Sequence, residues 1–190
     1  SPGLKIVAPS TPHDARGLLM AAALDRGPVL FYEHIALYRN PSIKQTLAEE
    51  SCLVEIGKAA FRQLGHDLTI LTYGAYAHRV NEKVEFLRQT QGIECDLIDL
   101  RTLMPIDWDA ISASLRRTHK VLLVGEDSRS GSILESIAAT IADDLFEYLD
   151  APVRILASLD TPVPYAPSLE EVFLPSQNDI EAAILQLHAW

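Results

Sequence analysis

The sequence predicts an α/β fold of three layers, in which helices cover both faces of a mostly parallel sheet. Short apolar runs at residues 68–72 and 120–124 are typical of strands buried on both faces. Two further strands are expected at 93–100, where Cys95 and Leu97 alternate with Asp96 and Asp99, and at 153–157. Segments with helical spacing of apolar residues separate these runs, and the links between them are short. A strand–helix–strand unit with short links makes a right-handed crossover, so its two strands lie parallel.

The first elements along the chain form one such unit. Residues 5–9 are an apolar strand, and Ser10-Thr11-Pro12 has the composition of a helix start. The Ala- and Leu-rich stretch 12–24 predicts a helix, and residues 29–33 predict the next strand. Two strands and one helix cannot bury a core alone. The unit therefore either joins the later sheet or belongs to a domain whose beginning is missing.

The rest of the chain repeats the alternation after a polar linker. The linker covers residues 38–53, with a domain boundary near 48, and a short strand is expected within 54–62. Gly92 ends the helix that follows the 68–72 strand. The later expected elements are helices at 107–118, 130–148 and 178–187, with a mostly irregular, proline-rich tail from residue 160.

Composition limits the partners and the compartment. The 190 residues carry a net charge of −10, which argues against a nucleic-acid partner and suits a basic protein partner. Cys52 and Cys95 form neither a metal spacing nor a disulfide framework, which favours a reducing compartment, and Cys95 reads as an inert buried thiol. The sequence shows no apolar run long enough to span a membrane and no signal peptide, so we expect no membrane partner.

Catalytic motifs are scarce, and two places remain as candidate sites. His34 follows Glu33 at the end of a predicted strand, where α/β sheets place their ligand crevices. Glu126 and Asp127 also follow a strand, beside the Ser130-Gly131 turn that opens a helix. The alternative for the second place is that Asp127 and Ser130 only cap that helix. From the residues alone, the chain is a soluble α/β domain without its own catalytic set.

The ordered motifs carry a resemblance that composition does not. In sequence order they are GLKIVAPSTPHDARGLL, DRGPVLFYEHIALYR, IGKA, DLTILTYG, DLIDLRTLMPID and DTPVPYAPSLEEVFLPSQNDI. Their order and spacing, from Gly3 to Ile184, resemble the beta subunit of the thiamine-dependent first component of 2-oxo acid dehydrogenases. The resemblance implies a transketolase C-terminal-type domain over residues 48–190. It also implies that residues 1–47 are the second half of a pyrimidine-binding domain plus the linker.

The same resemblance implies what the chain contributes to catalysis. The family's catalytic Glu and substrate-facing His lie upstream of this segment, so we expect no catalytic and no cofactor-binding residue here. Thiamine diphosphate and Mg²⁺ would be bound with the alpha subunit of the full enzyme. The family's potassium ion maps onto Ala22, Ala23, Asp25 and Gly27, where carbonyls free at a helix end suit a hard cation. Gly27 replaces the usual Asn, and the loop before Glu135 is one residue shorter than usual.

The resemblance implies three partners: the alpha subunit, a second beta subunit and the subunit-binding domain of the dihydrolipoyl acyltransferase. The compartment would be the bacterial cytoplasm or an organellar matrix. The implied function is oxidative decarboxylation of a 2-oxo acid with acyl transfer to lipoyl groups, for a longer parent protein. Two alternatives stay open, a non-catalytic assembly or regulatory module and another thiamine-dependent, transketolase-like enzyme.

Overall fold

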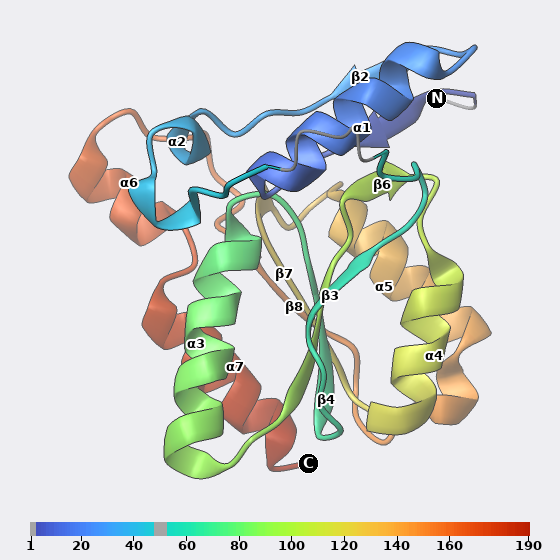
Figure 1. Cartoon of the computed structure of the whole chain (residues 1–190). Helices are drawn as coiled ribbons and strands as arrows, with labels where there is room; N and C mark the ends of the chain where they lie inside the picture. Colours follow the sequence, from blue (N-terminus) through green and yellow to red (C-terminus); the bar gives the residue numbers. More distant parts are fainter. Residues whose placement is uncertain (1–2, 48–52) are drawn as a thin grey trace.

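A computed structural model describes residues 3–47 and 53–190, and its largest feature is a five-stranded sheet (Figure 1). The strand order is β3-β5-β4-β7-β8, and all neighbours are parallel except β3, which runs antiparallel at one edge. The mostly parallel sheet is thereby confirmed. Its strands are β3 (Ala60–Gln63), β4 (Leu68–Thr72), β5 (Cys95–Asp99), β7 (Val121–Ser128) and β8 (Arg154–Ser158).

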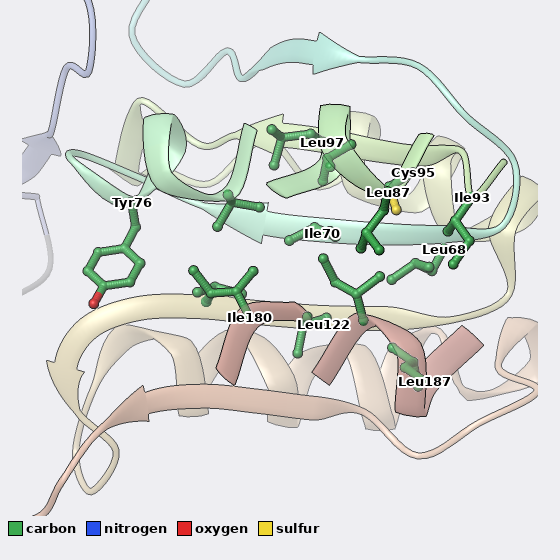
Figure 2. Packing of buried hydrophobic residues seen from close by; sticks show 14 of the residues in the cluster. Leu68, Ile70, Tyr76, Leu87, Ile93, Cys95, Leu97, Leu122, Ile180 and Leu187 are labelled. Carbon is green, nitrogen blue, oxygen red and sulfur yellow. The ribbon is translucent and has the colours of Figure 1, made fainter. Parts of the chain in front are cut away.

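Helices cover both faces of this sheet, as the three-layer prediction requires (Figure 1). One face carries α3 (Tyr76–Gln91) and α7 (Gln177–His188), and the other carries α4 (Trp108–Thr118) and α5 (Ile133–Asp144). Figure 2 shows the first face, where Leu68 and Ile70 of β4 pack with Leu87 of α3 and with Ile180 and Leu187 of α7. Every residue of β4 and β5 is buried, because both strands are covered on two faces.

A second, three-stranded sheet forms above the first. Its order is β2-β1-β6, with β1 (Lys5–Val7) parallel to β2 (Val29–Phe31) and antiparallel to β6 (Thr102–Met104). Helix α1 (Pro12–Leu24) packs on it through Leu18, beside the buried Val7. The N-terminal unit, residues 3–47, therefore does not join the larger sheet but takes one strand from the later chain. That residues 1–47 are part of a pyrimidine-binding domain stays a prediction, and residues 48–52, with the expected boundary, lie outside the described residues.

Four charged side chains join the N-terminal unit to the larger sheet. Asp14 of α1 and Asp99 of β5 have almost no exposed side-chain surface, and both contact Arg62 of β3. Arg62 Nη2 lies 2.7 Å from Asp99 Oδ2, and Arg101 Nη1 lies 3.0 Å from Asp14 Oδ1. This aspartate–arginine cluster balances two carboxylates with two guanidiniums. Removing one member would leave a buried charge without compensation.

The structure corrects several boundaries. The proline-rich stretch from residue 160 contains a helix that was not expected, α6 (Pro167–Phe173). The helix expected at 130–148 is α5, which ends at Asp144 and is followed by a 3₁₀ turn, Phe146–Tyr148. Helix α2 (Ile35–Tyr38) directly precedes the expected linker, and a 3₁₀ turn, Pro41–Ile43, lies within it. No helix in the described part of the chain is long and apolar enough to cross a membrane.

Candidate functional site

The carboxyl ends of strands from both sheets meet at one cavity. Its volume is about 640 Å³, and residues just after β1 and β2, just after β4 and at the end of β7 line it. Parallel α/β sheets place ligand crevices at such an edge. We name it the carboxyl-edge cavity, lined among others by Tyr32, Glu33, His34, Tyr73, Glu126, Asp127, Ser130 and Gly131.

His34 and Glu126 are paired at this cavity although 92 residues separate them. His34 Nε2 lies 3.0 Å from Glu126 Oε2, and both side chains are partly exposed. The hydrogen bond to Glu126 raises the pKa of His34, against the opposing effects of burial and of Arg79. The other ring nitrogen, Nδ1, is buried without a hydrogen-bond partner. The pair can therefore hold or release a proton at the boundary between the two sheets.

At the second candidate place, Asp127 and Ser130 make contacts that neither the ligand-site prediction nor the helix-cap prediction included. Asp127 accepts a hydrogen bond from the Tyr73 hydroxyl, and burial together with this bond raises the pKa of Tyr73. Ser130 donates through its amide and its hydroxyl to Asp160, at 2.9 and 2.8 Å. The N-cap of α5 is Ser132, whose hydroxyl accepts from the Glu135 amide. The prediction that Asp127 and Ser130 cap this helix is therefore wrong.

The residues around this helix start do not fit a phosphate group. The Gly131 amide donates to Glu135 and the Ser130 amide donates to Asp160, so carboxylates already occupy both donors. The charged lining of the cavity is also mainly acidic, with Glu33, Glu126 and Asp127. A diphosphate would be repelled here, so the lining of this cavity does not offer a binding site for one.

The four residues expected to bind potassium lie together, away from the cavity, at the C-terminal end of α1. Asp25 is the C-cap, and its amide donates to the Ala22 carbonyl at 3.3 Å. Its carboxylate contacts Lys5 Nζ and accepts from the Gly27 amide at 2.8 Å. Hydrogen bonds from Lys5 and from the Gly27 amide lower the pKa of Asp25. The carbonyls are suitable ligands, but the Lys5 ammonium competes with a cation for the carboxylate.

Sequence reasoning missed the partners that complete these places. Tyr73 and Asp160 were not selected, and neither pairing is visible in the local pattern. Arg62 and Arg101 were overlooked too, although the charged residues beside a buried strand were a signal for an ion cluster. Cys95 is buried as expected, and burial raises the pKa of its thiol to about 12, so it is not a nucleophile. The described residues include no group of three or more side chains able to hold a metal ion.

Comparison with known proteins gives several relatives. The chain is 44% identical over 187 residues to the 2-oxoisovalerate dehydrogenase subunit beta of Bacillus subtilis (strain 168), covering 98% of this chain and 56% of that protein. It is 41% identical over 186 residues to the pyruvate dehydrogenase E1 component subunit beta of Chaetosphaeridium globosum, with 98% and 56% covered. The acetoin:2,6-dichlorophenolindophenol oxidoreductase subunit beta of Bacillus subtilis (strain 168) is 38% identical, with 98% and 53% covered. The chain spans about half the length of these relatives.

Two further comparisons concern the fold. A solved structure titled "Split gene transketolase, inactive beta4 tetramer" matches with a TM-score of 0.76 and 22% identity, covering 99% of this chain and 58% of that one. At this identity the match shows the fold alone. Residues 57–180 match the family described as "Transketolase, C-terminal domain", which is more than half of the chain. The chain therefore belongs to the transketolase C-terminal domain family, and along nearly its whole length it is similar to dehydrogenase beta subunits.

Proposed function

We propose that this chain is the C-terminal part of the beta subunit of a thiamine-dependent 2-oxo acid dehydrogenase. The observation that carries the proposal is the similarity of 98% of the chain to beta subunits named for such enzymes. The parent protein would take part in oxidative decarboxylation of a 2-oxo acid and acyl transfer to lipoyl groups. Its compartment would be the bacterial cytoplasm or an organellar matrix.

In this proposal the chain supplies scaffold and assembly surfaces, not the reacting groups. Its cavity is acidic and does not fit the diphosphate of the cofactor, which supports binding of thiamine diphosphate and Mg²⁺ with an alpha subunit. The aspartate–arginine cluster would hold the N-terminal unit, as part of a pyrimidine-binding domain, on the C-terminal domain. The alpha subunit, a second beta subunit and the acyltransferase subunit-binding domain would be its partners.

The test is to isolate the natural polypeptide and to assay it with and without a co-expressed alpha subunit. We expect an intact mass well above 21.0 kDa and 2-oxo acid-dependent reduction of an artificial electron acceptor only when both subunits are present. The rate with pyruvate, 2-oxoisovalerate and acetoin then defines the substrate. A natural mass of 21.0 kDa with no activity beside any alpha subunit contradicts the proposal.

We also propose a potassium ion at the end of α1, bound through the carbonyls of Ala22, Ala23 and Gly27 and through Asp25. The position of these residues at the C-terminal end of α1, where carbonyls lack helical partners, and the lowered pKa of Asp25 support this proposal. KCl should raise the melting temperature more than NaCl at equal ionic strength, and Asp25→Asn should remove the difference. Equal effects of the two salts on the natural protein would contradict it.

A non-catalytic assembly or regulatory module is the second candidate, favoured by the lack of fit between the acidic cavity and a diphosphate. It predicts a natural chain of this length that binds partners without turnover. A further candidate is another thiamine-dependent, transketolase-like enzyme, which the shared fold permits. Transfer of a two-carbon unit between sugar phosphates without an alpha subunit would favour that candidate over the dehydrogenase.

A further inference from the structure

One ion pair ties a loosely held segment of the N-terminal unit to the larger sheet. The segment comprises residues 32–44, includes α2, and is called the α2 segment below. Figure 1 shows it running from β2, above the larger sheet, toward the side where α6 lies. Helix α2 buries none of its side chains. Within residues 3–47 and 53–190, the contact between His34 and Glu126 is the one hydrogen bond or ion pair that joins the α2 segment to the chain beyond residue 47.

The strength of this contact depends on one proton. His34 is the N-cap of α2, but its side chain does not cap the helix and is directed instead to Glu126, at the end of β7. His34 Nε2 can donate to the carboxylate both when the ring is neutral and when it is protonated. Protonation at Nδ1 adds a positive charge to the ring. A charge-assisted hydrogen bond is about twice as strong as a neutral one, so the protonated pair holds the segment more firmly.

The charges around His34 favour the protonated form. The hydrogen bond to Glu126 raises the pKa of His34, and it outweighs the burial of the ring and the charge of Arg79 on α3, which both lower this pKa. The groove between α2, α3 and α6 is lined by a second histidine, His78, whose Nε2 lies 2.6 Å from the Ser10 carbonyl. His78 can donate this bond in either charge state.

The pH dependence of the contact is therefore assigned to His34. A raised folded-state pKa adds stability that is present below the unfolded value of about 6.5 and is lost as the pH rises through the folded-state pKa. The other titratable or charged residues that line cavities together with His34 are Tyr32, Glu33, Tyr38, Arg39, Lys44, Tyr73, Tyr76, Glu82, Asp127, Glu170 and Glu171.

His34 also lies on the wall of three cavities. It lines the carboxyl-edge cavity, a second cavity of about 540 Å³ between the start of α1 and α2, and the groove between α2, the start of α3 and α6, of about 1080 Å³. Other residues of the α2 segment line each of these spaces as well. Movement of the α2 segment would therefore change the entrance of all three.

We propose that His34 and Glu126 form a pH-dependent latch, in which uptake of a proton by His34 tightens the attachment of the α2 segment to the larger sheet and loss of the proton loosens it. A loosened segment opens the three cavities that it borders. The inference goes beyond the proposed function and does not rest on it, since it uses only the position of one histidine between two parts of the fold.

The test uses the 190-residue chain and begins with the proton. Nuclear magnetic resonance follows the ring signals of His34 through the neutral pH range. We expect His34 to titrate at a higher pH in the natural chain than in Glu126→Gln, which keeps a hydrogen-bonding side chain but removes its charge. The matched control is Glu94→Gln, because Glu94 Oε2 lies 3.2 Å from His66 Nδ1 at the opposite ends of the strands, before β4 and β5. It should leave the titration of His34 unchanged.

Hydrogen exchange at short labelling times then measures the attachment of the α2 segment. At about pH 6, Glu126→Gln should speed exchange in the α2 segment by about twofold to fivefold relative to the natural chain, and at about pH 8.5 the two should differ little. Each comparison is made at one pH, so the intrinsic pH dependence of exchange cancels. Exchange in β4, and exchange in the α2 segment of Glu94→Gln, should change little at either pH.

The proposal is overturned if His34 titrates at the same pH in the natural chain and in Glu126→Gln, or if this variant acts as strongly at about pH 8.5 as at about pH 6. An equal response of β4, or an equal effect of Glu94→Gln on the α2 segment, overturns it too. The natural chain gives an independent measurement should Glu126→Gln fail to fold. Its protection in the α2 segment, corrected for intrinsic rates, should fall between about pH 6 and about pH 8.5, and constant protection would overturn the latch.

Discussion

At the scale of single residues, buried carboxylates decide how the two sheets are joined. The sequence presents Asp96 and Asp99 as polar residues of an alternating strand, yet both are fully buried. Asp96 accepts from Ser114 at 2.6 Å and contacts Arg117, and Asp99 contacts Arg62. Their burial could not be predicted locally, because the groups that neutralise them come from other elements.

The first prediction concerns Arg62. Arg62→Met should lower the free energy of unfolding by about 3 to 5 kcal/mol, because it leaves Asp14 and Asp99 buried with a single remaining cation nearby. Arg88→Met is the control, since Arg88 pairs with Glu85 on the surface of α3 and should contribute less than about 1 kcal/mol. Urea unfolding followed by circular dichroism measures both. Equal losses would mean that the buried cluster is no stronger than a surface pair.

The second prediction concerns pH and Asp14. Burial raises the pKa of Asp14, but hydrogen bonds and charge from Arg62 and Arg101 outweigh this effect and bring it down to about 2 from 3.8. A lowered folded-state pKa adds stability that is present above the unfolded value and is lost as pH falls, here about 2 kcal/mol between about pH 4 and about pH 2. Burial raises the pKa of Asp99, which gives the opposite slope.

The comparison with Asp14→Asn isolates the contribution of Asp14. The difference in unfolding free energy between the natural chain and the variant should be largest above about pH 4 and should shrink as the pH is lowered. Urea titrations at several pH values provide the measurement. A difference that stays constant down to about pH 2 would show that Asp14 does not titrate in this range.

At the scale of elements, strong hydrophobic periodicity was sufficient to predict a helix or a strand, whereas weak local signals were not. The strands β4 and β7 and the helices α3 and α4 follow the sequence pattern, because buried apolar runs and capped amphipathic segments specify them locally. The short β6 was missed because the strand with which it pairs among the described residues, β1, lies in the N-terminal unit. Helix α6 was missed because prolines dominate its surroundings, although Pro167 at its first position suits a helix start.

Gly65, in the link between β3 and β4, gives a prediction about how these strands are connected. A Cβ added there would lie 2.3 Å from the backbone of Glu94, so Gly65→Ala must displace the link and the Gly65 amide bond to Asp96. We expect a loss of about 2 kcal/mol or more. Gly27→Ala is the control, since its nearest atom would be an Asp25 carboxylate oxygen at 3.4 Å, and its cost should be under about 1 kcal/mol. Thermal melting that ranks the two variants the other way would contradict this expectation.

At the scale of the whole molecule, the fold brings strand ends together that are far apart in sequence. His34 and Glu126 were each selected because they follow predicted strands, and the parallel arrangement is what places them at one edge. Their pairing could not be predicted, because the second sheet and its position above the first depend on β6 and on the aspartate–arginine cluster. The class of fold could therefore be predicted from local patterns. The site could not, because it forms only where the two sheets come together.

The last prediction follows from that assembly and concerns the relative stability of the two sheets. Amides of α1 and β2 should exchange hydrogen faster than those of β4, because the N-terminal unit exposes Leu24, Leu30 and Tyr32 while β4 is buried on both faces. Arg62→Met should speed exchange in α1 further, with a smaller effect on β4, since it weakens the link between the sheets. Mass spectrometry of exchanged peptides measures both. Equal protection of α1 and β4 in the natural chain, or an equal response of the two to the variant, would mean that the sheets open only together and that the cluster joins parts of a single cooperative unit.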